Sequence, residues 1–194
     1  MKTGHLALVL LVGLLSFGFG ADETDIKLNP TLVNGSFAKP LEQGWTTQAD
    51  DIVGSHEFKA TPENGLVVTK EMCGSATVVQ DVSLKTTKVV FSARTRFAAQ
   101  ANKPDYYSSA SILLGYLDKD ENVLGETRIV AIAGGLPWQG SGTLHLLRAP
   151  LGEWYDTKLN LADELRENLP GVDPAEVKRL RVSLEALCSG TSAC

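Results

Sequence analysis

The residue types that perform most enzymatic chemistry are sparse and scattered in this sequence. After the first twenty residues the chain contains two histidines, His56 and His145, and neither has a companion at metal-ligand or catalytic spacing. The sequence contains no His-Glu-x-x-His, Gly-x-Ser-x-Gly or phosphate-cradling Gly-Lys-Ser/Thr motif. The carboxylates of Asp118, Asp120 and Glu121 occupy a polar stretch typical of a solvated turn. We therefore expect a protein that is not an enzyme.

Aromatic residues in expected loops favour sugar binding, because flat rings cover the apolar face of a pyranose. Trp138 lies in the glycine-rich segment Gly-Gly-Leu-Pro-Trp-Gln-Gly, which either presents the indole to a ligand or lets it fold back over the end of the core. Tyr106 and Tyr107 are adjacent in another expected loop, an arrangement in which often one ring packs and one is exposed. Trp45 and Trp154 are expected to anchor the core.

Three arginines are further candidate ligand-binding residues. Arg94 and Arg96 share one face of an alternating run, and Arg128 shares a face with Glu126 on an expected neighbouring strand. Guanidinium groups on such a surface suit sugar hydroxyls or an acidic glycan. The same pattern is also typical of a solvated face with cross-strand ion pairs.

Length and charge exclude several classes of protein. The chain has 194 residues, 43% of them hydrophobic and 21% charged, which is the ordinary range for a single globular domain. Eighteen basic residues against 23 acidic ones give a net charge of −5, without the broad positive surface that nucleic acid requires. We expect no nucleic-acid partner.

The first twenty residues have the pattern of a cleaved signal peptide. Lys2 precedes an apolar run from Leu6 to Phe17, and Gly18 and Gly20 place small residues at the −3 and −1 positions before Ala21. A transmembrane anchor is the alternative, but the run is shorter than the roughly 20 residues that a bilayer requires. We expect residues 1–20 to be removed, no membrane span, and a secreted or periplasmic domain over residues 21–194.

Export would place three cysteines, Cys73, Cys188 and Cys194, where disulfides persist. One internal bridge at most can form, leaving one thiol over. The short, glycine-containing separation favours Cys188 with Cys194, and Cys73 with Cys188 is the rival pairing.

Short alternating or β-branched runs, separated by Gly, Pro, Asn and Asp, predict an all-β antiparallel sandwich. Lys119–Asn122 is the expected connection of a hairpin spanning Ser108 to Ile132. The eight expected strands before the helical region are Leu32–Phe37, Ile52–Lys59, Gly65–Glu71, Ala76–Leu84, Lys88–Ala98, Ser108–Asp118, Val123–Ile132 and Thr143–Arg148.

The region after Trp154 predicts one or two short helices and a ninth strand. Asn160 can cap a helix over Leu161–Asn168, which Pro170-Gly171 would end. Asp173-Pro174 is a start signal for one further helical turn. Leu180–Ala186 alternates again and is expected to rejoin a sheet.

Three segments together resemble carbohydrate-binding modules with the galactose-binding-like jelly roll. These are Asn34-Gly35-Ser36-Phe37 followed by Gly44-Trp45, the small-residue run from Ser75 that leads to Gln80, and the hairpin from Ser109 to Gly125. The resemblance implies a jelly-roll sandwich whose partner is a carbohydrate or polysaccharide. It also implies acidic residues beside the opening Asn-Gly that often hold a structural calcium, but the matching positions here are Ser36 and Ala38. We therefore expect no cofactor.

The family pattern also continues into a last strand that this sequence does not supply beyond Cys194. A missing strand would leave an edge for another chain to pair with. The leading hypothesis is thus a secreted, non-catalytic glycan-binding module. The alternative is a structural or protein-interaction β-sandwich of the cell envelope, with another envelope protein as its partner and no sugar site.

Overall fold

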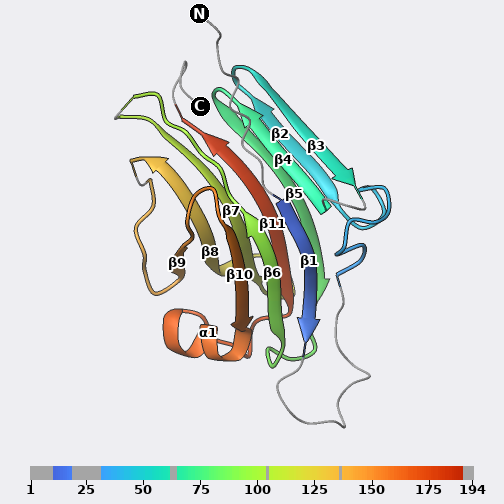
Figure 1. Ribbon diagram of the computed structural model, residues 1–194. Helices are drawn as coiled ribbons and strands as arrows, with labels where there is room; N and C mark the ends of the chain where they lie inside the picture. The colour runs from blue at the N-terminus through green and yellow to red at the C-terminus, as the bar shows by residue number, and fades with distance from the viewer. Residues whose placement is uncertain (1–10, 19–31, 62–64, 104, 136, 190–194) are drawn as a thin grey trace, which may run out of the picture.

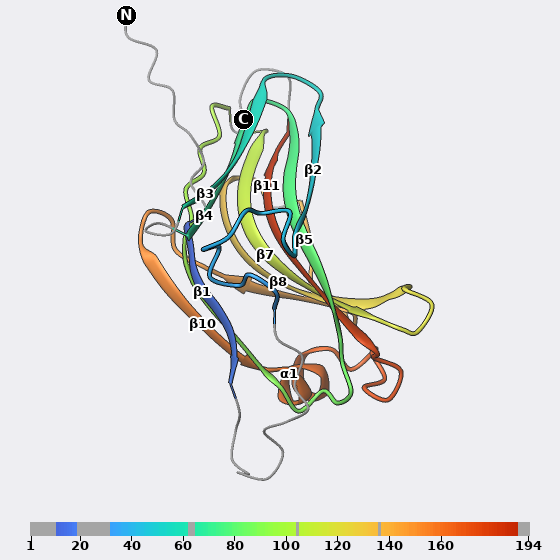
Figure 2. The ribbon, with the colours of Figure 1, turned by 90° about the vertical axis from the view of Figure 1, so that its right-hand side faces the viewer.

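The chain folds into two β-sheets that pack face to face, with a short helix at one end (Figures 1 and 2). The computed structural model describes residues 11–18, 32–61, 65–103, 105–135 and 137–189. In spatial order, sheet A contains β10 (Trp154–Asn160), β6 (Val90–Arg96), β1 (Leu11–Gly18), β4 (Gly65–Glu71) and β3 (Ser55–Thr61). Sheet B contains β2 (Thr46–Asp51), β5 (Gly74–Ser83), β11 (Arg179–Cys188), β7 (Tyr107–Leu117), β8 (Val123–Gly134) and β9 (Leu144–Arg148). The mostly β, two-layer architecture is the one the alternating runs predicted.

The core lies between the sheets because apolar residues recur at every second position of the central strands. Along β5 buried and half-buried residues alternate from Gly74 to Val82. Phe91, Ala93 and Phe97 are buried, while Arg94 and Arg96 of the same segment are exposed. The opposing layer contributes the fully buried side chains of Ala76, Val78, Ala110, Ile112, Leu114, Leu180, Val182 and Leu184.

Several predicted elements are confirmed. β4 has the predicted bounds, and β5 to β9 and β11 lie within a few residues of theirs. The β7–β8 hairpin is present, and the Asp118 carboxylate stabilises its tip by accepting from the backbone N–H groups of Asp120 (2.8 Å) and Asn122 (2.9 Å). The strand expected to rejoin a sheet, β11, pairs on one side with β5 and on the other with β7.

The prediction of a strand over Leu32–Phe37 is wrong, because this segment forms turns. Asn34 and Phe37 have φ values of 53° and 55°, in the left-handed region, which a strand cannot include. The Asn34 amide holds the loop by donating to the carbonyls of Lys39 and Pro40. Gln80 of β5 fixes the same loop by donating to the carbonyls of Val33 (2.9 Å) and Gly44 (2.6 Å).

Two edge strands were not predicted, and one boundary was displaced. β2 is exposed at every position and therefore shows no apolar alternation. β10 could not be recognised in the sequence because its outward-facing residues include a tryptophan, so polar and apolar residues do not alternate along it. The strand expected over Ile52–Lys59 begins instead at Ser55, after a turn in which Gly54 has a φ of 90°.

The prediction of a wholly antiparallel sandwich is wrong, because one pair of strands is parallel. β8 and β9 run parallel, with Arg128 opposite Leu146. The cause is the connection after β8, which carries the chain back along the sheet before β9 begins, as a parallel neighbour requires. Trp138 lies in this connection.

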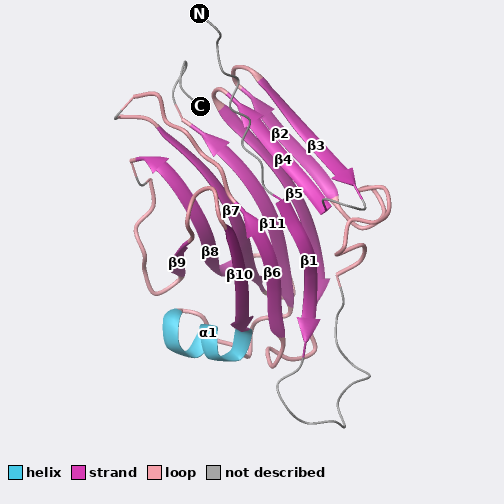
Figure 3. Ribbon diagram, in the orientation of Figure 1, coloured by secondary structure: helices cyan, strands magenta, loops and turns pink. Residues whose placement is uncertain are grey.

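The helix α1 (Leu161–Asn168) has the predicted bounds and is shown in Figure 3 below the two sheets. Asn160 caps it, accepting from the backbone N–H groups of Ala162 (3.1 Å) and Asp163 (3.4 Å). The prediction of a further helical turn after Asp173 is wrong. Asp173 accepts from Ala175 N (2.8 Å), but the chain makes only a turn before it enters β11.

The segment that the sequence marks as a leader has a place in this fold. Leu11–Gly18 forms β1, antiparallel to β6 at six register positions and to β4 at one, Val12 with Leu66. Cleavage after Gly20 would therefore separate from the domain a strand that lies between β6 and β4. The resemblance to carbohydrate-binding modules implied that a last strand is missing at the other end of the chain. The strand described nearest that end, β11, is paired on both sides.

Candidate functional site

The face of sheet B that points away from the core carries one of the three candidate arginines, Arg128, among a larger set of polar side chains. Cross-strand register aligns Arg128 of β8 with Leu113 of β7, Ser183 of β11, Val79 of β5 and Thr46 of β2. Because side chains alternate along each strand, residues two positions away lie on this face too. The polar face, as we name it, consists of Thr46, Gln48, Thr77, Val79, Asp81, Ser111, Leu113, Glu126, Arg128, Arg181, Ser183 and Glu185.

Arg128 is the most constrained residue of the polar face. Its Nε donates to Glu126 Oε1 at 2.8 Å, and its Nη1 donates to Glu185 Oε2 at 3.2 Å. The guanidinium carbon lies 4.0 Å from the centre of the Trp138 ring, a stacked cation–π contact. Only 8% of Arg128 is exposed. Three partners therefore fix the position of both the guanidinium and the indole above it.

Glu185 lies in a site where its charged form is poorly solvated. Burial raises the pKa of its carboxyl above the ordinary value, and the nearby charge of Glu126 acts in the same direction. Arg128 and the Ser111 hydroxyl, which donates to Glu185 Oε2 at 3.3 Å, oppose that rise in pKa. One arginine thus serves two carboxylates on this part of the face.

The predicted aromatic residues are partly brought together. Tyr107, expected in a loop, is the first residue of β7, and its ring lies 6.1 Å from that of Trp138 in an edge-on arrangement. Trp138 is half-buried and lies against Arg128 on the outer side of sheet B, away from the core cluster. Tyr106 instead lies under the Lys103 ammonium, 5.3 Å from the ring centre.

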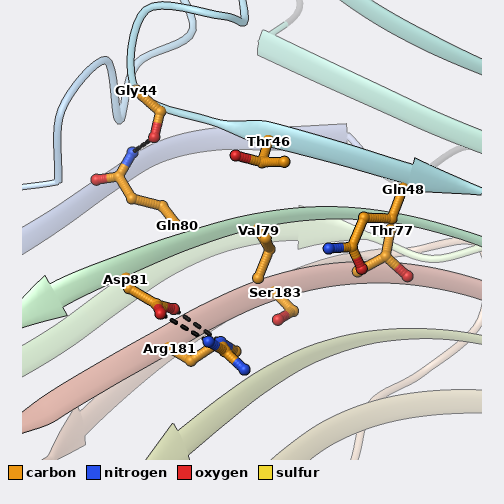
Figure 4. Close-up of a pocket in the computed structure, with 9 residues that line it drawn as sticks. All are labelled: Gly44, Thr46, Gln48, Thr77, Val79, Gln80, Asp81, Arg181 and Ser183. Atoms are coloured by element: carbon orange, nitrogen blue, oxygen red, sulfur yellow. Dashed lines mark hydrogen bonds and ion pairs between the residues drawn. The ribbon is translucent and has the colours of Figure 1, made fainter. Parts of the chain in front are cut away.

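A hollow of about 430 Å³ opens over the part of the polar face formed by β2, β5 and β11 (Figure 4). The Arg181 guanidinium donates to both carboxylate oxygens of Asp81, at 2.8 and 2.7 Å, and so forms a fixed bidentate pair at its floor. Ser183, which lines the hollow, and Glu185, which accepts from Arg128, are alternate residues of β11 and therefore lie on the same face of the sheet. The lining residues are Gly44, Thr46, Gln48, Thr77, Val79, Gln80, Asp81, Arg181 and Ser183.

Arg94 and Arg96 do not join this site, so the prediction that they neighbour Arg128 is wrong. They lie on β6 of sheet A, whereas Arg128 lies on β8 of sheet B. Alternation within each strand was visible in the sequence, but the assignment of strands to sheets was not.

The two tryptophans expected in the core have different environments. Trp45 is 4% exposed, packs against Phe37 with ring centres 5.2 Å apart, and donates to the Asn34 carbonyl, so that prediction is confirmed. Trp154 is 45% exposed, so its assignment to the core is wrong. It begins β10, an edge strand, and the alternation of that strand turns its ring outward.

The predicted Cys188–Cys194 disulfide falls partly on residues outside the described part of the chain, because Cys194 is not described. The rival pair is not bonded: the Cys73 thiol lies 3.9 Å from the carbonyl oxygen of Cys188. The Cys188 sulfur is buried, 3.6 Å from Ser108 Oγ. Among the described residues, no group of three or more His, Cys, Asp or Glu side chains is arranged to hold a metal ion.

Sequence reasoning missed Asp81, Arg181, Ser183, Glu185 and Gln48, which make up much of the polar face. Their spacing along the strands was a usable signal, because Arg181, Ser183 and Glu185 are two positions apart and Thr77 and Asp81 are four apart, which keeps each set on one face of its strand. What the pattern lacked was the information that β11 lies between β5 and β7.

Comparison with known protein families and with curated proteins finds no match to this chain. Within the described ranges, no helix has both the length and the apolar character needed to cross a membrane.

Proposed function

We propose that this chain is an exported, non-catalytic carbohydrate-binding module of the galactose-binding-like jelly-roll type. The polar face of sheet B, together with Trp138, is its ligand site. The observation that carries the proposal is the Arg128-clamped indole on the same sheet as a hollow lined by hydroxyl, amide and carboxylate groups. An aromatic ring held rigidly beside fixed polar groups suits a sugar, whose C–H face and hydroxyls require both.

The charges of the polar face favour a neutral glycan. Asp81, Glu126 and Glu185 are three carboxylates, and the two arginines present, Arg128 and Arg181, already donate to them. An added acidic group would compete for these arginines and meet the remaining carboxylate charge. Neutral hydroxyls can instead accept from Thr, Ser and Gln groups and donate to the carboxylates.

A binding panel of neutral polysaccharides tests the proposal, measured by affinity electrophoresis and then by calorimetry. Trp138→Ala is expected to weaken binding at least about tenfold, because a central aromatic anchor is lost. Trp154→Ala, which removes a tryptophan from the other sheet, is the matched control and is expected to bind as the parent does. Thermal melts check that both variants fold.

Two outcomes would overturn the proposal. Retained affinity in Trp138→Ala would remove the site from the polar face. Absence of binding by the parent across the panel would favour the alternative, a structural or protein-interaction domain of the envelope.

A further inference from the structure

We propose that the outer face of sheet A carries a second binding surface, specific for acidic polysaccharide. It goes beyond the function proposed above, and no residue of it lies on the polar face of sheet B. We name it the Trp154 patch, and it consists of Arg94 and Arg96 of β6 and Trp154, Asp156 and Lys158 of β10.

Strand register brings the members of the patch together. Trp154 lies opposite Arg96 and Asp156 opposite Arg94, in adjacent antiparallel strands of sheet A. The Arg94 guanidinium carbon lies 5.1 Å from the centre of the Trp154 ring, so these two side chains meet diagonally across the strands. The patch is therefore a continuous surface of side chains from two paired strands.

The patch is open to solvent. Trp154 is 45% exposed, and the side chains of Arg94 and Asp156 are 59% and 78% exposed. Trp45 and Trp138, by contrast, are buried and half-buried. An indole exposed to this degree on a sheet face costs solvation free energy that a ligand covering the ring would recover.

The charge of the patch is opposite to that of the whole protein. Three cations, Arg94, Arg96 and Lys158, face one carboxylate, Asp156, although the chain as a whole has a net charge of −5. The sequence of the neighbouring strand β1, Leu11–Gly18, contains no charged residue. The patch therefore concentrates positive charge and attracts an anionic ligand.

The arginines have donors to offer such a ligand. Arg96 uses its Nε to donate to the Gly152 carbonyl at 2.9 Å, which holds the guanidinium in place, and its terminal nitrogens donate to no other residue that the structure describes. The Arg94–Asp156 pair is long, at 3.7 Å, and exposed, so a ligand acid group can replace Asp156 at small cost. Guanidinium groups match the planar carboxylate of an acidic sugar in a bidentate manner.

A polysaccharide fits this patch better than an acidic peptide does. An extended peptide would pair with the backbone of the edge strand β10, whereas the members of the patch are side chains on the face of the sheet, and a ligand lying across β6 and β10 covers them. The ring of Trp154 supplies the flat apolar surface that covers the C–H face of a pyranose.

The test uses the full chain and two polymers that share one backbone, polygalacturonate and its fully methyl-esterified form. The parent is expected to bind the acid polymer, to bind the neutral ester at least about tenfold more weakly, and to lose affinity as salt screens the charges. Trp154→Ala and the double variant Arg94→Gln/Arg96→Gln are each expected to lose about tenfold in affinity for polygalacturonate. A sulfated polysaccharide, run beside it, shows whether sulfate replaces carboxylate.

Controls separate this proposal from the function proposed for sheet B. Arg166→Gln removes an exposed arginine of α1, and Trp138→Ala removes the other aromatic platform; both are expected to bind acid polymer as the parent does. All the substituted side chains on sheet A are exposed, so thermal melts are expected to match the parent. A parent protein that binds the acid polymer but no neutral glycan would reject only the function proposed for the polar face.

Three results would overturn the proposal: equal binding of the acid polymer and its ester, unchanged affinity in Trp154→Ala, or no binding of any acidic polysaccharide by the parent. Binding of polyglutamate in place of the acidic polysaccharides would assign the patch to an acidic peptide and also reject it.

Discussion

At the scale of single residues, the main feature of the site is that one arginine, Arg128, interacts with two carboxylates. Arg128 donates to Glu126 and Glu185 and also stacks on Trp138, so one buried guanidinium fixes two carboxylates and a ring. The pKa of Glu185 is raised, chiefly by burial, because its charged form has lost solvation that Arg128 does not fully replace. This makes Glu185 a measurable reporter of the electrostatics of the site.

The substitution Glu185→Gln is expected to remove a pH-dependent contribution to stability. A carboxyl whose pKa is raised by folding stabilises the folded state most below its unfolded pKa. That contribution is lost as the pH rises from the ordinary value of 4.5 through the raised value in the fold. The free energy of unfolding of the parent should therefore fall relative to that of Glu185→Gln over this interval.

Urea denaturation of both proteins at several pH values across the interval measures this difference. Glu153→Gln, which changes an exposed carboxyl, serves as the control and should follow the parent. A difference between parent and Glu185→Gln that stays constant with pH would contradict the expectation.

At the scale of elements, the clearest local signal was the helix cap, and it was confirmed. Asn160 accepts from two backbone N–H groups at the start of α1, as its position before an apolar-periodic segment predicted. The helix in turn positions Glu164, which accepts from Thr127 of β8 at 2.7 Å and lies 2.5 Å from His145 Nδ1 of β9. By stabilising the start of α1, the cap helps to hold Glu164 in contact with sheet B.

Asn160→Ala is expected to lower the free energy of unfolding by about 1 kcal/mol, because two N–H groups of the first helical turn lose their acceptor. Urea denaturation measures the effect, and Asn160→Asp, which retains a capping oxygen, is the matched control and should stay close to the parent. Equal losses in both variants would show that the amide, and not the cap, is what matters.

Edge strands limited the prediction of elements. β2 is exposed at all positions, so nothing in its sequence marked a strand, and Trp154 in β10 looked like a core residue because tryptophans usually are. Both strands are positioned by backbone pairing with a neighbour, β2 with β5 and β10 with β6. Pairing depends on residues distant in sequence, which local patterns do not record.

At the scale of the whole molecule, the N-terminal segment has two roles that exclude each other, a cleaved signal peptide, as the sequence predicts, and a strand of sheet A. Leu11–Gly18 reads as the apolar part of a signal peptide, yet as β1 it lies between β6 and β4 (Figure 1). Its pairing is strongly one-sided, with six register positions on β6 and one on β4. A chain that begins at Ala21 lacks this strand, which leaves one edge of β6 without its partner.

We expect the backbone amides of Val90–Arg96 that face β1 to exchange with solvent faster in a protein of residues 21–194 than in the full chain. Hydrogen exchange measured by mass spectrometry compares the two, with β7 and β11, which belong to the other sheet and do not pair with β1, as the internal control. Equal protection of β6 in both proteins would mean that another segment or chain has taken the position of β1. N-terminal sequencing of the protein purified from the cells that express it tests the predicted cleavage.

The sequence by itself determined the β class, most central strands, the β7–β8 hairpin and the capped helix, because alternation, turn residues and capping act over a few neighbouring positions. It also singled out Trp138, Tyr107 and Arg128. Only the tertiary structure decided that these three share a face with Asp81, Arg181 and Glu185, and that Arg94 and Arg96 lie on the other sheet beside Trp154. The physical reason is that strand order and the division into sheets depend on long-range backbone pairing and on burial of the common core, and neither is encoded in the period of any single strand.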